Sequence, residues 1–133
     1  MILVDSSVWI GLFRGDHTPQ TQLALSILQS GDEELAIADF ILLEVLQGFR
    51  SEKQAQAAFQ SFSGLPCFTL SGKPLAVLAA SNYRRLRQKG ITIRSTIDCL
   101  IASFCVKNNI PLLHCDHDYD AFEQHLGLRV MQF

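Results

Sequence analysis

The sequence predicts an α/β protein, a three-layer α/β/α domain with a central parallel sheet of about five strands and helices on both faces. Short apolar runs alternate along the chain with longer segments whose apolar residues recur at helical spacing. The runs are apolar throughout, as strands buried on both faces of a parallel sheet require. Of the 133 residues, 48% are hydrophobic and 18% charged, so we expect one folded domain over residues 1–133.

The first 30 residues predict a strand followed by two helices. Ile2–Val4 is a short apolar run that leads into a polar turn. Ser6–Phe13 is expected to be a short helix that ends before Gly15. A longer helix is expected over Thr18–Ser30, because its first residue can act as a cap and Pro19 suits the first helical position.

The middle of the chain repeats this alternation. Leu35–Ala38 is the second apolar run, and Asp39 is expected to cap a helix over Phe40–Phe49. A further helix is expected over Ser51–Gly64. The third strand is expected over Cys67–Leu70.

The last 60 or so residues predict three more helices and two more strands. The helices are expected over Pro74–Lys89, Ser95–Asn108 and Asp118–Leu126. The strands are expected over Pro111–Cys115 and Leu128–Phe133. The whole pattern is typical of strands joined by helical crossovers.

The composition argues against several classes of protein. A net charge of −2 argues against binding of nucleic acid through bulk charge, so any basic site must be local. No apolar run approaches the ~18–20 residues of a membrane span, and no segment has the form of a secretory signal. The four cysteines form no CxxC pair and no disulfide framework, which fits a reducing compartment. We therefore expect a cytoplasmic protein with no membrane partner.

Four acids stand at positions where chemistry is expected. Asp5 follows the first strand and Asp116 follows the fourth, and ligands of parallel α/β sheets bind at the carboxyl ends of the strands. Glu44 is the only charged residue within an apolar helix turn. Asp98 borders the buried stripe of its own helix rather than facing open water.

Each of these acids also has a purely structural interpretation. Asp5 suits the cap of the helix that follows it, and Asp98 stands three residues after a serine, the spacing of a capping box. Glu44 is compatible with a solvated position beside an apolar stripe. Asp116 is compatible with a solvated turn in which Asp118 caps a helix. For each acid taken alone, both interpretations stay open.

Taken together, the four acids indicate a metal site. Carboxylates gathered at one place repel and raise one another's pKa unless a cation lies between them. A small hard cation such as Mg²⁺, or Mn²⁺ as a substitute, prefers carboxylates and water as ligands. Such an ion lowers the pKa of a bound water and orients it for attack on a phosphodiester. Asp5, Glu44, Asp98 and Asp116 therefore predict metal-assisted hydrolysis.

At these positions the sequence resembles the PIN-domain endoribonucleases, and among them the VapC toxins of type II (VapBC) toxin–antitoxin systems. The stretch ILVDSSVWIGLFRG resembles the opening motif, an apolar strand leading into Asp-Ser-Ser. IADFILLEVLQGFR resembles the second motif, with its Glu in a helix. STIDCLIASFCVKNNIPLLHCDHDYDAF resembles the third and fourth motifs, an Asp at a helix start and a strand ending in Asp-x-Asp-aromatic. The resemblance covers nearly the whole chain.

This resemblance implies roles for the four acids, a fold and a set of partners. Asp5, Asp98 and Asp116 match acids that hold Mg²⁺, and Glu44 matches one that acts through water. The implied sheet has the strand order 3-2-1-4-5. The implied substrate is RNA, and the implied partners are a second copy of the chain and a VapB-type antitoxin whose tail occupies the acidic pocket.

Five further residues are candidates for supporting roles. Asp118 matches a fifth acid found in many family members, and Ser6 or Thr96 is a candidate to supply a hydroxyl to the metal-bound water. Arg14 and Arg94 adjoin the acidic motifs. We expect them to contact the RNA backbone, which arginine grips without reading sequence.

Two residues depart from the family's pattern. His114 stands two residues before the fourth acid, where relatives often carry Ser or Thr, and Tyr119 replaces the commoner Phe after the Asp-x-Asp pair. We expect neither residue to touch the four acids. His114 is expected to be a core histidine at the end of a strand, with an effect on pH dependence as the alternative.

Two other functions remain as alternatives to a metal-dependent endoribonuclease toxin. An acid-based phosphatase of the haloacid-dehalogenase type needs a second Asp two residues after its nucleophilic Asp, and the residue two after Asp5 is Ser7. The other alternative is a non-catalytic module that binds RNA or protein on a PIN-like scaffold. Such a module has no need of all four acids.

Overall fold

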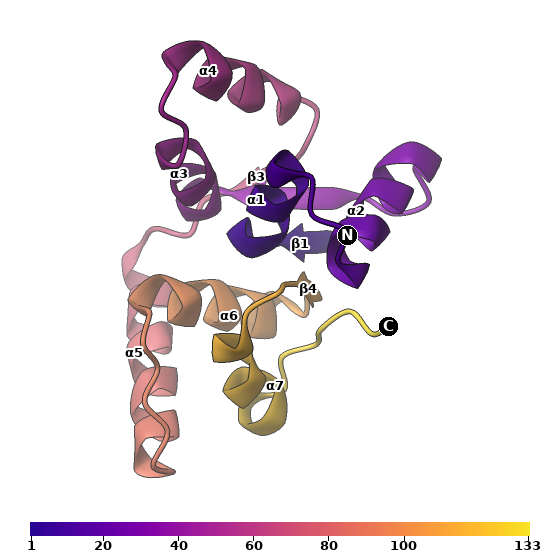
Figure 1. Cartoon of the computed structure of the whole chain (residues 1–133). Helices are drawn as coiled ribbons and strands as arrows, with labels where there is room; N and C mark the ends of the chain where they lie inside the picture. Colours follow the sequence, from indigo (N-terminus) through magenta and orange to yellow (C-terminus); the bar gives the residue numbers. More distant parts are fainter.

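The computed structural model covers residues 1–133 and contains a parallel four-stranded sheet flanked by seven α-helices (Figure 1). The strands are β1 (Ile2–Val4), β2 (Leu35–Ala38), β3 (Cys67–Phe68) and β4 (Leu112–Leu113). The helices are α1 (Ser6–Arg14), α2 (Pro19–Ser30), α3 (Asp39–Gln47), α4 (Glu52–Ser61), α5 (Lys73–Gln88), α6 (Thr96–Asn108) and α7 (Asp120–Leu126), with a 3₁₀ turn η1 (His117–Tyr119) before α7. The predicted α/β class is confirmed.

The strand order is β3-β2-β1-β4, with every pair parallel. Leu3 is the centre of this register, because it pairs with Ala36 of β2 on one side and with Leu112 of β4 on the other. In Figure 1, α1 to α4 lie in the upper half of the view and α5 to α7 in the lower half, with β1 and β4 between them. The predicted order 3-2-1-4 is therefore confirmed for these four strands.

The predicted fifth strand, Leu128–Phe133, is reduced to a single parallel bridge between Leu112 and Val130. Leu112 donates its N–H to the carbonyl of Arg129 (2.9 Å), and its carbonyl accepts from Met131 (3.1 Å). Within this segment only Leu128 is buried. One buried side chain gives the segment little reason to extend the ladder, so it occupies the fifth position without becoming a strand.

The third strand is also shorter than predicted, because the N–H of Leu70 donates to the side chain of Asp39 and not to a neighbouring strand. Its Oδ1 accepts from the N–H of Leu70 (3.1 Å) and from that of Phe40 (2.8 Å). Asp39 was predicted to be the cap of α3, but it is the first residue of the helix, and Ala38 occupies the cap position without a side-chain hydrogen bond. The Asp39 carboxylate therefore ends β3 and ties it to the start of α3.

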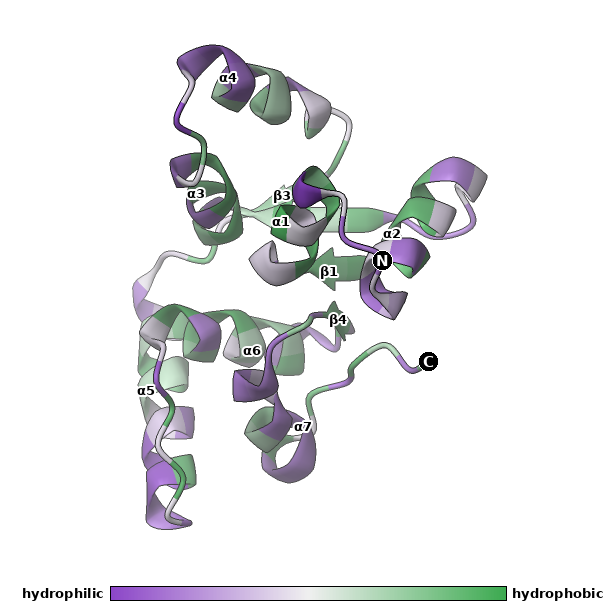
Figure 2. Cartoon of the chain, viewed as in Figure 1, coloured by the Kyte–Doolittle hydropathy of each residue, from purple (hydrophilic) through white to green (hydrophobic).

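The core is built on the two central strands. Every residue of β1 and β2 is buried, and Trp9 of α1 donates its indole N–H to the carbonyl of Val4 (3.0 Å). The Trp9 ring meets the edge of Phe62 with centroids 5.1 Å apart, which fixes the end of α4 against α1. Figure 2 shows hydrophobic colour over these strands and hydrophilic colour on outer turns of the helices. No helix is both long enough and apolar enough to cross a bilayer.

Replacing Asp39 with Ala is expected to lower the free energy of unfolding by about 1–3 kcal/mol, because the amide of fully buried Leu70 loses its acceptor. Asp39→Asn keeps an acceptor oxygen and is expected to lose less than half as much. Urea denaturation of the three proteins measures the difference. Equal midpoints for the Ala and Asn variants would show that the hydrogen bond to Leu70 does not stabilise the fold.

Candidate active site

Asp5 lies at the carboxyl end of β1 and directly precedes α1. Its backbone N–H donates to the carbonyl of Leu113 in β4 (2.9 Å), which fixes it between the two strands. Its Oδ2 accepts from the N–H (3.0 Å) and the hydroxyl (2.6 Å) of Ser7, so the residue caps α1 as the structural interpretation predicts. The side chain is nevertheless buried, with only 2% of the residue exposed. Capping uses one carboxylate oxygen and leaves Oδ1 for a second partner.

That second partner is Tyr119, which sequence reasoning missed. Its hydroxyl donates to Asp5 Oδ1 at 2.7 Å and also to Asp98 Oδ1 at 3.2 Å. The expectation that Tyr119 does not touch the four acids is therefore wrong. The motif identified an aromatic ring suited to the core, and the ring is indeed fully buried, but its hydroxyl ends between two carboxylates. The only feature of the sequence that could have indicated this contact is the hydroxyl that Tyr has and Phe lacks.

Asp98 lies in the first turn of α6, where Ser95 caps the helix by accepting from the Asp98 N–H (3.2 Å). The reciprocal bond of a capping box is not formed, because the Asp98 carboxylate turns toward Tyr119 instead. The residue is 7% exposed. Its backbone therefore serves the helix, while its side chain faces Asp5.

Glu44 reaches the same region from α3. The hydroxyl of Ser6 donates to Glu44 Oε1 at 3.2 Å, and Ser6 is the residue directly after Asp5. The side chain is half-buried, so the interpretation of Glu44 as a fully solvated position does not hold. Of the two candidate hydroxyl donors, Ser6 meets an acid. Thr96 hydrogen-bonds to none of the acids and lines a hollow between α5 and α6.

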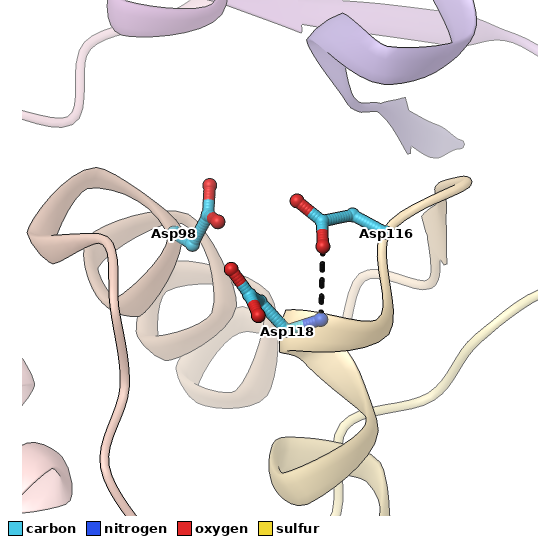
Figure 3. Close-up of side chains that lie close together, drawn as sticks. All are labelled: Asp98, Asp116 and Asp118. Carbon is cyan, nitrogen blue, oxygen red and sulfur yellow. Dashed lines mark hydrogen bonds between the residues drawn. The ribbon is translucent and has the colours of Figure 1, made fainter.

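Asp116 and Asp118 approach from the segment after β4. Asp116 Oδ1 accepts from the N–H of Asp118 (2.9 Å), so Asp116 caps η1 and the predicted cap role of Asp118 is wrong. Asp98, Asp116 and Asp118 each offer a carboxylate oxygen, and these three oxygens lie within 4.8 Å of one another. Figure 3 shows the three carboxylates around one space between α6 and η1.

His114 supports this turn. Its Nδ1 accepts from the backbone N–H of Asp116 (3.1 Å), and its ring lies against Tyr119 with centroids 4.9 Å apart. Burial lowers the pKa of the imidazole, against the opposing effect of the nearby carboxylates. His114 is thus half-buried at the end of β4, yet it does contact Asp116 through the backbone, contrary to expectation.

Only one of the two predicted arginines, Arg94, forms an ion pair with an acid of the candidate site. Arg94 donates from Nε (3.2 Å) and Nη2 (2.9 Å) to Asp118 Oδ1, and its side chain is 80% exposed. Arg14 pairs with Asp16 (2.9 Å), outside the group of predicted acids. Arg94 is therefore the cation that adjoins the acidic cluster directly.

A family profile described as "PIN domain" matches residues 2–124. The chain belongs to the PIN domain family. The predicted membership is thereby confirmed, and the acids gathered after β1 and β4 form the candidate active site of a PIN domain.

Similar proteins cover the whole length of this PIN domain. Ribonuclease VapC11 of Mycobacterium tuberculosis (strain ATCC 25618 / H37Rv) is 28% identical over 133 residues, which are 100% of this chain and 99% of the relative. The solved structure of VapBC2 from Rickettsia felis, bound to a promoter DNA fragment, matches with a TM-score of 0.73 at 22% identity, covering 100% and 99% of the two chains. VapBC-5 of M. tuberculosis, from the VapBC family of toxin–antitoxin systems, matches at 0.70 with 15% identity, covering 99% and 98%.

The electrostatics of the PIN domain's acids favour binding of a cation. Burial, followed by the charges of Asp5 and Asp116, raises the pKa of Asp98 from 3.8 to about 7, although the hydrogen bond from Tyr119 opposes the shift. Burial and the charge of Asp5 also raise the pKa of Glu44. The available ligand atoms are carboxylate oxygens, the donor set that hard divalent ions prefer. A divalent ion bound here would attract the carboxylates that otherwise repel one another.

In the absence of divalent ions, the free energy of unfolding is expected to fall as the pH rises from about 4 to about 7. The folded state holds a proton on Asp98 up to a pKa of about 7, whereas the ordinary pKa of an aspartate is 3.8, so protonation favours folding over this range. Urea denaturation in EDTA measures this loss. The full shift corresponds to about 4 kcal/mol, and solvent screening of a group near the surface reduces it. Over the range, the wild type should therefore lose about 1–2 kcal/mol more than the Asp98→Asn variant, which has no carboxyl at this position to titrate. Parallel curves for the two proteins would contradict the assignment.

Proposed function

We propose that this PIN domain is a Mg²⁺-dependent endoribonuclease and the toxin of a type II toxin–antitoxin system. The observation that carries the proposal is the convergence of Asp5, Glu44, Asp98 and Asp116 at the carboxyl edge of one sheet, where their charges act on one another. The full-length likeness to a protein named a ribonuclease supports RNA as the substrate. The acid cluster supports metal-assisted chemistry, with Mg²⁺ as the physiological ion and Mn²⁺ as a substitute.

Asp5, Asp98 and Asp116 would hold the ion, with Asp118 beside them. The two oxygens of Asp5 are fixed by Ser7 and Tyr119, and the capping bond to the Asp118 N–H fixes Asp116, so the carboxylates have little freedom to turn away. When bound, the ion lowers the pKa of a coordinated water and screens the charge that develops on the phosphate. The protein's own contribution is to bring these carboxylates together before substrate arrives.

Glu44 is suited to take a proton from the attacking water. Ser6 engages Oε1, which leaves Oε2 without a hydrogen-bond partner. Burial and the neighbouring charge of Asp5 raise the pKa of Glu44, and this brings a carboxylate closer to the range in which a general base works at neutral pH. This role agrees with the expectation that Glu44 acts through water rather than as a direct ligand.

The proposed partners follow from the same likeness. We propose that a VapB-type antitoxin binds the chain, since proteins of the same fold have been solved as VapBC pairs. We also propose that the chain forms a homodimer, as its resemblance to the VapC toxins implies. The cytoplasm is the proposed location, in keeping with four free cysteines. Arg94, and less directly Arg14, would contact the phosphates of a bound RNA strand.

Asp5→Asn is expected to lower the rate of RNA cleavage by at least about 100-fold, because it removes the charge of one of the proposed metal ligands. Asp120→Asn is the matched control, since Asp120 belongs to the same acidic run but is exposed and pairs with His117. The assay uses single-stranded RNA with Mg²⁺, and circular dichroism checks folding. Cleavage by a folded Asp5→Asn protein at the wild-type rate, or cleavage by the wild type in EDTA, would contradict the proposal. Failure of the wild type to cleave any RNA would favour a non-catalytic module.

Arg94→Ala, made in the inactive Asp5→Asn background, is expected to raise the Kd for single-stranded RNA and to reduce the salt slope of binding by about 1. Arg85→Ala is the control, because Arg85 is exposed on α5 and forms no ion pair. Fluorescence anisotropy at several salt concentrations measures both quantities. Equal effects of the two substitutions would remove Arg94 as a specific phosphate contact.

A further inference from the structure

We propose that Tyr119 is a positioning residue whose hydroxyl holds Asp5 and Asp98 in the arrangement that binds a divalent cation, and thereby sets the affinity for that cation. This inference rests on the metal site of the proposed function. The hydroxyl donates to Asp5 Oδ1 at 2.7 Å and to Asp98 Oδ1 at 3.2 Å. It therefore joins the end of β1 to the first turn of α6, two segments that are far apart in sequence.

In this chain the hydroxyl links two acids that are both buried. Asp5 is 2% and Asp98 7% exposed, so water screens their repulsion poorly. Without a donor between them, rotation of either side chain away from the other would relieve the repulsion. A hydroxyl whose single hydrogen is shared between the two carboxylates favours the close arrangement before an ion is present. Residues that orient metal ligands in this way typically change metal affinity by ~10–100-fold when they are altered.

The hydroxyl leaves one oxygen of Asp98 free to bind an ion. It engages one oxygen of Asp98, and Asp98 Oδ2 accepts no hydrogen bond in the protein. Asp98 also belongs to the group whose oxygens lie within 4.8 Å of those of Asp116 and Asp118. Asp98 can therefore accept from Tyr119 and still lie within reach of an ion held by Asp116 and Asp118.

Tyr119 itself has little freedom to move. Its ring is fully buried and packs against His114, and its backbone N–H donates to the carbonyl of Asp116 (3.2 Å). The turn that carries Tyr119 is thus the turn that positions Asp116. Packing alone would require only the ring, since a phenylalanine has the same shape apart from the oxygen. The oxygen is the part that contacts the acids.

The test is titration of the metal-free protein with Mn²⁺, with free Mn²⁺ followed by electron paramagnetic resonance. Tyr119→Phe is expected to raise the Kd for Mn²⁺ by about 10–100-fold. Tyr83→Phe is the matched control, because the hydroxyl of Tyr83, the only other tyrosine, forms no hydrogen bond, and its Kd should equal that of the wild type. In the RNA cleavage assay, the Mg²⁺ concentration for half-maximal rate should rise by the same factor, with the rate restored at high Mg²⁺.

The outcomes separate this inference from the proposed function. If the wild type binds Mn²⁺ and Asp98→Asn does not, but Tyr119→Phe binds with the wild-type Kd, the role of Tyr119 is wrong and the metal site stands. If the wild type binds no Mn²⁺ at all, both proposals are wrong. Tyr119→Met provides a second variant without the hydroxyl, should Tyr119→Phe fail to fold, and the same rise in Kd is expected of it. Circular dichroism in EDTA checks the fold of every variant.

Discussion

Repulsion among buried and half-buried carboxylates is the constraint on which the rest of this structure depends. A parallel sheet brings the carboxyl ends of β1 and β4 to one edge, and α3 and α6 add acids from the sides. Burial would normally neutralise such groups or drive them apart. Here each acid receives a hydrogen bond from a nearby donor, which offsets part of the cost. What remains unbalanced is negative charge, and a divalent cation would balance it.

Helix capping and chemistry are not competing explanations for these acids. Asp5 caps α1 with one oxygen and meets Tyr119 with the other. The Asp98 backbone completes the cap of α6, while its side chain accepts from Tyr119 beside the other acids. The amino-terminal ends of both helices therefore face the acid cluster, where their dipoles favour negative charge. Residues whose spacing predicts a helix cap therefore also belong to the candidate site.

Sequence reasoning reached the fold class, the strand order and the group of acids, because each leaves a local sign. Apolar runs mark the strands, and caps and glycines mark the helix ends. It did not predict the long-range hydrogen bonds of the Tyr119 and Asp39 side chains, because their partners lie far away in the chain and leave no periodic pattern. The fifth strand was overestimated for a related reason. An apolar run predicts burial, but pairing depends on the neighbour, and here only Val130 pairs.

Crystals of the wild-type chain grown with Mn²⁺ would test the central claim most directly, through anomalous diffraction at the manganese edge. The account predicts one strong peak among Asp5, Asp98 and Asp116, with carboxylate oxygens at about 2.0–2.3 Å, and loss of that peak in the Asp98→Asn variant. A fully occupied manganese elsewhere on the surface, with the four acids left without an ion, would contradict the claim that their repulsion is resolved by a divalent cation.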